Sequence, residues 1–197
     1  MARRIWEPAC GPGAIVRILR EAGHIVTATD LVDYGCPDSR GGVDFLKVES
    51  APDDVECIVT NPPYRIANEF AAKALELVPR VILLLRLNFL EALSRTDILD
   101  DGRLAWVYPF IRRLPHMHRD SWDRPKTGSA MALAWFRWDR NHRGPPRKLS
   151  GSDSRNAKCA KNRSLGGRMP FSVAIGADNV LTALSRIMRR KPFTRED

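Results

Sequence analysis

The segment Asn61-Pro62-Pro63-Tyr64 holds the residue types that point most directly to a reaction. It follows the apolar run Cys57-Ile58-Val59, so its side chains are expected at the end of a strand. The amide oxygen of Asn61 can accept a hydrogen bond, the prolines have a fixed φ, and the ring of Tyr64 offers a face for stacking. These groups suit a site that holds a flat amine while its nitrogen reacts. The alternative is a plain turn, because asparagine and proline are common turn formers.

A second group of residues, near the start of the chain, suits a nucleoside. The run Glu7-Pro8-Ala9-Cys10-Gly11-Pro12-Gly13 places two glycines ahead of a helix, where the backbone can approach a ligand and N–H groups are free. Asp30 follows at the end of the next apolar run, about 20 residues on, where such sheets place a carboxylate for ribose hydroxyls. Val16 stands where a dinucleotide fingerprint needs its third glycine, which argues against NAD. A glycine turn that merely connects elements is the alternative.

Both groups require a sheet whose strand ends meet at one edge. Apolar runs predict strands at residues 5–6, 24–29, 44–46, 57–59, 80–85, 104–108 and 130–138. Helical periodicity appears at 14–22, which Gly23 would cap, and at 66–77; residues 31–42 are expected to form a loop, and 89–93 a helix start or irregular lid. Strands alternating with helices predict an α/β fold with a mostly parallel sheet covered on both faces.

In order and spacing, these motifs resemble S-adenosylmethionine-dependent methyltransferases of the amino-methylating branch, typified by N6-adenine DNA methyltransferases. The resemblance covers residues 5–138 and includes Asp44-Phe45-Leu46 between the two halves. It implies the class I methyltransferase fold, a Rossmann-like seven-stranded sheet that is mostly parallel, with helices on both faces and the last strand antiparallel. In its small size the chain resembles such enzymes of phage or mobile elements.

The resemblance also implies a role for each matching residue. Gly11 and Gly13 would border the methionine portion of S-adenosylmethionine, Asp30 would bind its ribose, and Asp44 with Phe45 would hold its adenine. The cofactor-binding residues would be Glu7, Pro8, Ala9, Gly11, Gly13, Asp30, Leu31, Asp44, Phe45 and Asn61, and the catalytic ones Asn61, Pro62, Pro63 and Tyr64. No strong base is expected, because transfer from a sulfonium yields an ammonium that loses its proton readily.

The substrate stays open, because related motifs serve adenine, guanine and protein glutamine. N6 of adenine in DNA is favoured; the alternatives are an RNA or protein glutamine amino-methyltransferase, or a non-catalytic nucleic-acid-binding module. Basic residues around an aromatic in the segment 110–129 are expected to bind nucleic acid, with a solvated loop as the alternative: Arg112, Arg113, Arg119, Trp122, Arg124 and Lys126. Only six residues precede Glu7, so we expect that a segment that packs over the cofactor in relatives is absent or that the chain is truncated.

The charge divides the chain into two parts. Of the net +9, residues 1–139 hold 18 basic and 19 acidic side chains, whereas residues 140–197 hold 14 basic and 4 acidic ones. We therefore expect a methyltransferase domain at 1–140 and a basic, largely irregular tail at 141–197 with a helix at 173–188. The four cysteines are widely spaced, and His116 with His118 lacks a third ligand, so no metal site is predicted. No apolar run approaches the ~18 residues of a membrane span, and a cytoplasmic location is expected.

Overall fold

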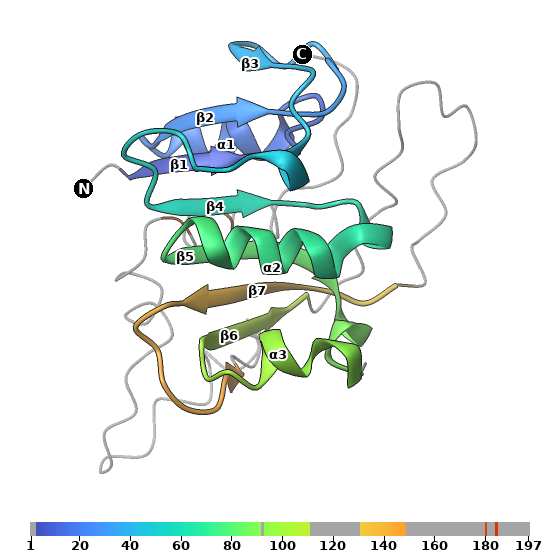
Figure 1. Cartoon of the computed structure of the whole chain (residues 1–197). Helices are drawn as coiled ribbons and strands as arrows, with labels where there is room; N and C mark the ends of the chain where they lie inside the picture. Colours follow the sequence, from blue (N-terminus) through green and yellow to red (C-terminus); the bar gives the residue numbers. More distant parts are fainter. Residues whose placement is uncertain (1–2, 92, 111–130, 149–179, 181–183, 185–197) are drawn as a thin grey trace, which may run out of the picture.

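The described residues form one mixed sheet of eight strands (Figure 1). The structure is a computed structural model that describes residues 3–91, 93–110, 131–148, 180 and 184. The strand order is β3-β2-β1-β4-β5-β7-β6-β8. The bounds are Arg4–Glu7 for β1, Ile25–Thr29 for β2, Ser39–Arg40 for β3, Cys57–Thr60 for β4, Arg80–Arg86 for β5, Leu104–Pro109 for β6, Leu133–Asp139 for β7 and Arg147–Lys148 for β8.

The strand directions place several carboxyl ends at one edge of the sheet. The strands β3, β2, β1, β4 and β5 are parallel neighbours, and β7 runs antiparallel to both β5 and β6. This confirms the predicted mostly parallel sheet and the antiparallel seventh strand, to which the short β8 adds an eighth, parallel to β6. The ends of β1, β2, β4 and β5 lie toward the right of Figure 1.

Helices cover both faces of the sheet, as predicted (Figure 1). The helix α1, Ala14–Glu21, packs on one face, and α2, Ala67–Leu77, packs on the other with α3, Thr96–Leu99. Within β5, Ile82 and Leu84 face the first layer, whereas Val81, Leu83 and Leu85 face the second. Because β5 is buried on both faces, its sequence is a continuous apolar run instead of an alternating one.

The helix α1 ends as its sequence predicts. Gly23 has a φ of 83°, and its N–H donates to the carbonyl of Arg20 at 2.9 Å while the N–H of His24 donates to the carbonyl of Leu19 at 3.1 Å. This pair of bonds is the Schellman ending, which favours glycine because the left-handed conformation strains residues with a Cβ. The ending turns the chain sharply into β2.

Two sequence predictions are wrong between β2 and β4. Asp44-Phe45-Leu46 is not a strand: Asp44 caps a 3-10 turn, η1 (Phe45–Lys47), because its Oδ1 accepts the N–H of Leu46 at 3.2 Å. The third strand is instead Ser39–Arg40, inside the segment 31–42 expected as a loop, and it pairs with the end of β2. A short polar side chain that bonds its own backbone favours a turn over a strand.

Among the described residues, three further 3-10 turns follow η1 along the chain, and two of them overlap the segment 89–93 that was expected as a helix start or irregular lid. They are η2 at Tyr64–Ile66, η3 at Leu87–Glu91 and η4 at Leu93–Arg95. Most of the segment 141–197 lies outside the described residues, but Arg147–Lys148 forms β8. Val180 and Leu184 are helical, and each is 1% exposed in the core cluster that contains α1.

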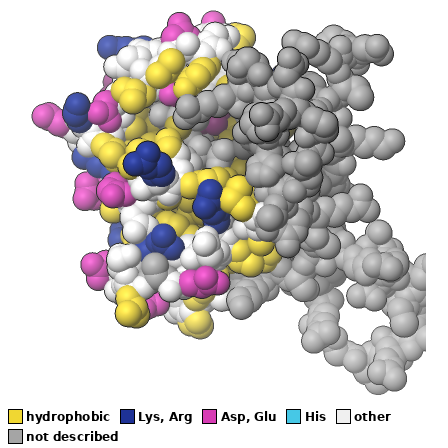
Figure 2. All heavy atoms as spheres, turned by 90° about the vertical axis from the view of Figure 1, so that its right-hand side faces the viewer, with side chains coloured by type: hydrophobic (Ala, Val, Ile, Leu, Met, Phe, Trp, Pro, Cys, Tyr) yellow, Lys and Arg dark blue, Asp and Glu magenta, His cyan; other side chains and the backbone are white. Residues whose placement is uncertain are grey.

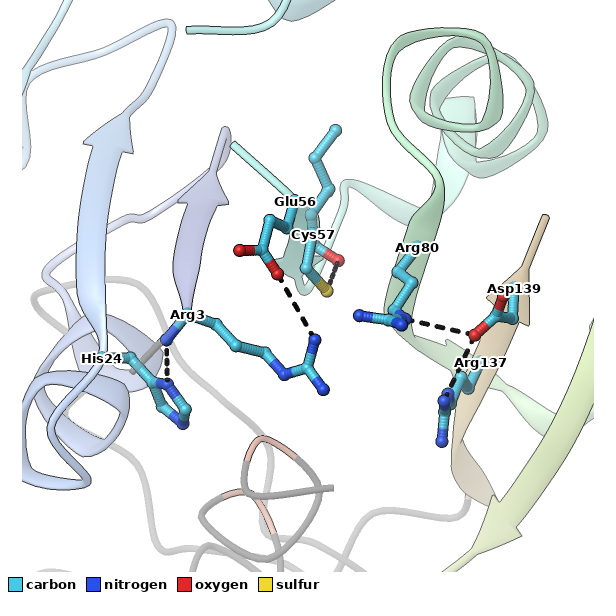
Figure 3. A network of polar contacts seen from close by, with 8 residues as sticks. Arg3, His24, Glu56, Cys57, Arg80, Arg137 and Asp139 are labelled. Carbon is cyan, nitrogen blue, oxygen red and sulfur yellow. Dashed lines mark hydrogen bonds and ion pairs between the residues drawn. The ribbon is translucent and has the colours of Figure 1, made fainter. Parts of the chain in front are cut away.

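Ion pairs lie at the amino edge of the sheet (Figure 3). There Oδ2 of Asp139, at the end of β7, accepts from Nε of Arg80 at 3.2 Å and from Nη2 of Arg137 at 3.4 Å. Burial alone would raise the pKa of Asp139, but the N–H of Asn141 and the two guanidinium groups outweigh it and lower the pKa. Because these charges are paired with one another, we assign this edge a structural role.

Candidate active site at the carboxyl edge of the sheet

The predicted site residues meet where β1, β2 and β4 end. The strand β1 pairs with β2 on one side and with β4 on the other. Trp6 of β1 lies opposite Thr27 of β2 and opposite Ile58 of β4. The chain therefore leaves these three strands side by side, after Glu7, Thr29 and Thr60. Figure 2 looks at this edge and shows Lys and Arg side chains among hydrophobic ones.

The turn after β1 needs its second glycine for two reasons. Gly13 has a φ of 85° and begins α1 as its N-cap, with its N–H donating to the carbonyl of Cys10 at 2.9 Å. A Cβ on Gly13 would lie 2.6 Å from Sγ of Cys36, whereas a Cβ on Gly11, at a φ of 51°, would meet no atom within 4 Å. The turn therefore brings backbone N–H groups to the edge of the sheet at the start of a helix, where an anion or a polar ligand atom can bind.

Asp30 holds the turn to the end of β2. Its Oδ2 accepts the N–H of Gly11 at 2.8 Å, and its Oδ1 accepts the N–H of Val32 at 3.2 Å. An ionised carboxylate has about four acceptor positions, so two remain for hydroxyl groups of a ligand. Leu31, which follows, is 62% exposed and offers an apolar surface next to that carboxylate.

Glu7 is a buried carboxyl group with an open acceptor. It is 1% exposed, and its Oε2 has no hydrogen-bond partner within the described part of the chain. Burial raises the pKa of Glu7 well above its ordinary value, the N–H of Val16 partly opposes this, and the charge of Asp30 adds to it. Burial thus shifts Glu7 toward the neutral acid relative to an exposed glutamate. A cationic ligand group against Oε2 would supply the missing partner and stabilise the carboxylate.

Phe45 lies in the core instead of at the surface of the site. It is 3% exposed, and its ring stacks on Phe70 at 4.1 Å and meets Trp6 edge to face at 5.2 Å. A ligand would therefore meet its backbone N–H, which begins η1 and has no intrahelical partner there. Beside it, Oδ2 of Asp44 pairs with Nζ of Lys47 at 3.2 Å.

The end of β4 presents an unpartnered amide oxygen. Oδ1 of Asn61 is buried and has no hydrogen-bond partner among the described residues, and the same holds for Oγ1 of Thr60. Pro62 is buried, whereas Pro63 is exposed with a φ of −58° and leads into η2. An unpaired buried acceptor costs about 1–3 kcal/mol. An N–H donor placed against Asn61 would recover that energy.

A cavity of about 110 Å³ opens beside Tyr64. Arg86, the last residue of β5, places its guanidinium carbon 4.8 Å from the centroid of the Tyr64 ring. Burial raises the pKa of Tyr64, and the charge of Arg86 offsets part of that rise. The cavity is lined by Tyr64, Ala67, Leu85, Arg86, Asn88, Phe89 and Arg95.

The structure extends the predicted site in one direction and leaves another part undescribed. Arg86, Asn88 and Arg95 were not predicted as site residues, although Arg86 directly follows the apolar run 81–85 and this signal could have marked it. Pro8 is buried and Ala9 packs against the core, so both shape the turn. The predicted nucleic-acid-binding residues lie outside the described part of the chain: Arg112, Arg113, Arg119, Trp122, Arg124 and Lys126.

The described residues contain no group of three or more His, Cys, Asp or Glu side chains placed to hold a metal ion. None of the helices formed by these residues is long and apolar enough to cross a membrane.

The fold is similar to that of solved methyltransferases. No protein-family model matches the sequence, and no curated protein matches it. A proposed RNA methyltransferase from Pyrococcus horikoshii is 12% identical over 70% of this chain and 74% of that protein, with a TM-score of 0.53. A Thermoplasma acidophilum protein is 15% identical over 71% of this chain and 80% of that protein, with a TM-score of 0.49. A dimethyladenosine transferase from Plasmodium falciparum is 14% identical over 70% of this chain and 56% of that protein, with a TM-score of 0.44. The strand order and the first of these likenesses confirm the predicted Rossmann-like class I methyltransferase fold.

Proposed function

We propose that this chain transfers a methyl group from S-adenosylmethionine to an exocyclic amino group, namely N6 of adenine in DNA. The observation that carries the proposal is the buried, unpartnered Oδ1 of Asn61 at the end of β4. It lies at the same edge as the glycine turn after β1, which suits a nucleoside. An acceptor that lacks a donor, next to such a turn, is what the capture of an amine N–H requires.

The residues of the turn fit S-adenosylmethionine in charge and in hydrogen bonding. Glu7 would hold the cationic amino group of its methionine portion, since Oε2 lacks a partner among the described residues. Asp30 keeps acceptor positions for the ribose hydroxyls, and Asp44 with the backbone of Phe45 would hold the adenine. When bound, the cofactor supplies an electrophilic methyl group on a positively charged sulfur.

The residues after β4 would prepare the acceptor amine. The lone pair of an exocyclic amine is delocalised into its ring, so the nitrogen is a poor nucleophile. Oδ1 of Asn61 and the carbonyl of Pro62 would accept its two hydrogens, which favours a pyramidal nitrogen with a directed lone pair. Pro63 and the turn η2 restrict this segment before the substrate arrives. A base is unnecessary here, because the methylated ammonium loses its proton readily to water.

The ring of Tyr64 favours a planar base as the substrate. Extruding a base from a duplex costs a few kcal/mol, and stacking on an aromatic ring returns about 1–3 kcal/mol. The basic residues at 112–126 and in the tail would add phosphate contacts whose strength falls with salt. DNA is preferred on the resemblance of the motif to N6-adenine DNA methyltransferases, and RNA and protein are the competing acceptors.

The test is incubation of the full chain with labelled S-adenosylmethionine and separate pools of DNA, RNA and protein. Label at N6 of adenine in DNA is expected. Label in protein alone would remove the adenine hypothesis, and label in RNA alone would replace DNA as the substrate. A cofactor titration accompanies it, because absence of binding would favour a non-catalytic module.

Asn61→Ala tests the observation that carries the proposal. The variant should bind the cofactor nearly as the wild type does, whereas methyl transfer falls about a hundredfold or more because the amine loses an acceptor in the transition state. Asn141→Ala, an exposed asparagine at the opposite edge, is the matched control and should transfer normally. Transfer by Asn61→Ala at the wild-type rate would refute the role of Asn61.

A further inference from the structure

A cation covers one face of the aromatic ring on which the substrate base would stack. Arg86 ends β5, the strand adjacent to β4, and its guanidinium lies over Tyr64 with 4.8 Å between its central carbon and the ring centroid. Its side chain is exposed, and within the described part of the chain it forms no ion pair with a carboxylate. Among the described residues, the observed partner of the Arg86 side chain is thus the ring that a base would need.

The other arginine of the cavity differs from Arg86 because it is held in place. Nε of Arg95 donates to Oδ1 of Asn68 at 2.6 Å, and its Nη1 donates to the carbonyls of Asn88 and Phe89 at 3.2 and 3.0 Å. Its guanidinium also lies 4.4 Å from the centroid of the Phe89 ring. These contacts give Arg95 a structural role beside η3, whereas Arg86 is the exposed charge at the cavity.

The lining of the cavity favours an anion. It contains two arginines and an asparagine and no acidic side chain among the described residues. A guanidinium presents its donors in a planar fork that matches phosphate oxygens, and an anionic group near the ring can bind it when it leaves the ring. The backbone of a nucleic acid whose base enters the site supplies such a group, whereas a glutamine side chain carries no charge.

We infer that Arg86 is a substrate-sensing residue: it leaves the ring of Tyr64 when the base stacks there and binds a phosphate of the same strand. The inference rests on the proposed function and deepens it, because it assigns the substrate class to polynucleotides. It also explains why the cation lies on the ring in the ligand-free chain, where it covers the stacking surface until a substrate with both a base and a phosphate arrives.

Arg86→Ala separates the two substrate features. Methyl transfer is measured with an adenine-containing oligonucleotide over a range of salt concentrations and with adenosine, which has no phosphate. For the oligonucleotide, KM should rise about tenfold near 0.1 M salt, and the slope of log KM against log salt should fall by about 0.7 to 0.9, the value of one phosphate contact. Transfer to adenosine should be kept or improved, because the ring is no longer covered.

Two further variants keep the test independent of folding. Arg86→Lys retains the charge, so it should keep the salt slope of the wild type. Arg4→Ala removes the same charge from an exposed side chain at the amino edge of the sheet, and its kinetics should match the wild type.

The outcomes are distinguishable from a failure of the proposed function. A wild type that methylates adenine while Arg86→Ala keeps its KM and salt slope overturns the inference alone. An equal loss with adenosine and oligonucleotide also overturns it, because Arg86 would then merely support the fold of the site. A wild type that transfers methyl groups to no adenine substrate refutes the proposed function, and the inference falls with it.

Discussion

Glu7→Gln should stabilise the ligand-free chain and weaken its cofactor binding at the same time. In the folded wild type the pKa of Glu7 is raised well above its ordinary value of 4.5, chiefly by burial, whereas the unfolded chain keeps the ordinary value. Between these two values the folded chain holds a proton that the unfolded chain has lost. The free energy of unfolding of the wild type therefore falls as the pH rises from 4.5 to the folded pKa. A glutamine side chain does not titrate, so the free energy of unfolding of the variant should not fall in this way as the pH rises.

The magnitude follows from the slope of this linkage. In that window the folded chain holds one more proton than the unfolded chain, so each pH unit lowers the free energy of unfolding by about 1.4 kcal/mol. For a chain of this size that corresponds to a difference in Tm of about 3 to 6 °C per pH unit between variant and wild type. Thermal unfolding of both proteins from pH 4.5 to 8 measures it. Glu49→Gln, which alters an exposed side chain, is the matched control and should show no such difference.

The cofactor should reverse the sign of the effect. A charge-assisted hydrogen bond from a cationic amino group to Oε2 is worth about 1.5–3 kcal/mol, so the variant should bind S-adenosylmethionine about tenfold to a hundredfold more weakly. Isothermal titration calorimetry measures the two Kd values. Parallel stability curves for wild type and variant, or equal affinities for the cofactor, would refute the assignment of Glu7 as the open acceptor of the site.

Two more substitutions test the supports of the site and of the opposite edge. Gly13→Ala should lower the free energy of unfolding, measured in urea, by about 2–3 kcal/mol, because a φ of 85° is strained for alanine and the new Cβ meets Cys36. Gly11→Ala should lower it by only about 1 kcal/mol, because its Cβ meets no atom. The reverse order would contradict this account. Asp139→Asn should have a free energy of unfolding about 1 kcal/mol below that of the wild type at pH 7. This difference should be complete above pH 3.8 and should disappear as the pH falls through the lowered pKa of Asp139. A difference that persists in acid would show that the shape of the side chain, and not its charge, stabilises this edge.

The sequence was sufficient for elements with a strong local pattern. The buried residues of α1 follow helical spacing and Gly23 ends it, so the helix and its cap were predicted correctly. The strand predicted at 44–46 failed because Asp44 can bond its own backbone, a competition that apolar patterning does not register. The two-residue β3 could not be predicted either, since its pairing depends on the end of β2 and not on its own composition.

The candidate site was predicted where polar residues directly follow apolar runs. That rule marked Glu7, Asp30 and Asn61, and the structure places them at one edge of the sheet because parallel strands bring their carboxyl ends together. It did not mark Arg86, which joins the candidate site because β5 lies beside β4 and the Arg86 side chain lies over Tyr64.

By itself, the sequence determined which chemical groups the chain can offer: an amide acceptor followed by two prolines, a glycine turn and two carboxylates at strand ends. Only the tertiary structure decided their state. It engages both oxygens of Asp30 with backbone N–H groups, and it buries Oε2 of Glu7 and Oδ1 of Asn61 without a hydrogen-bond partner among the described residues. The reason is physical: the pKa of a carboxyl group and the pairing of an acceptor depend on the atoms that surround them, and here those atoms come from distant segments of the chain.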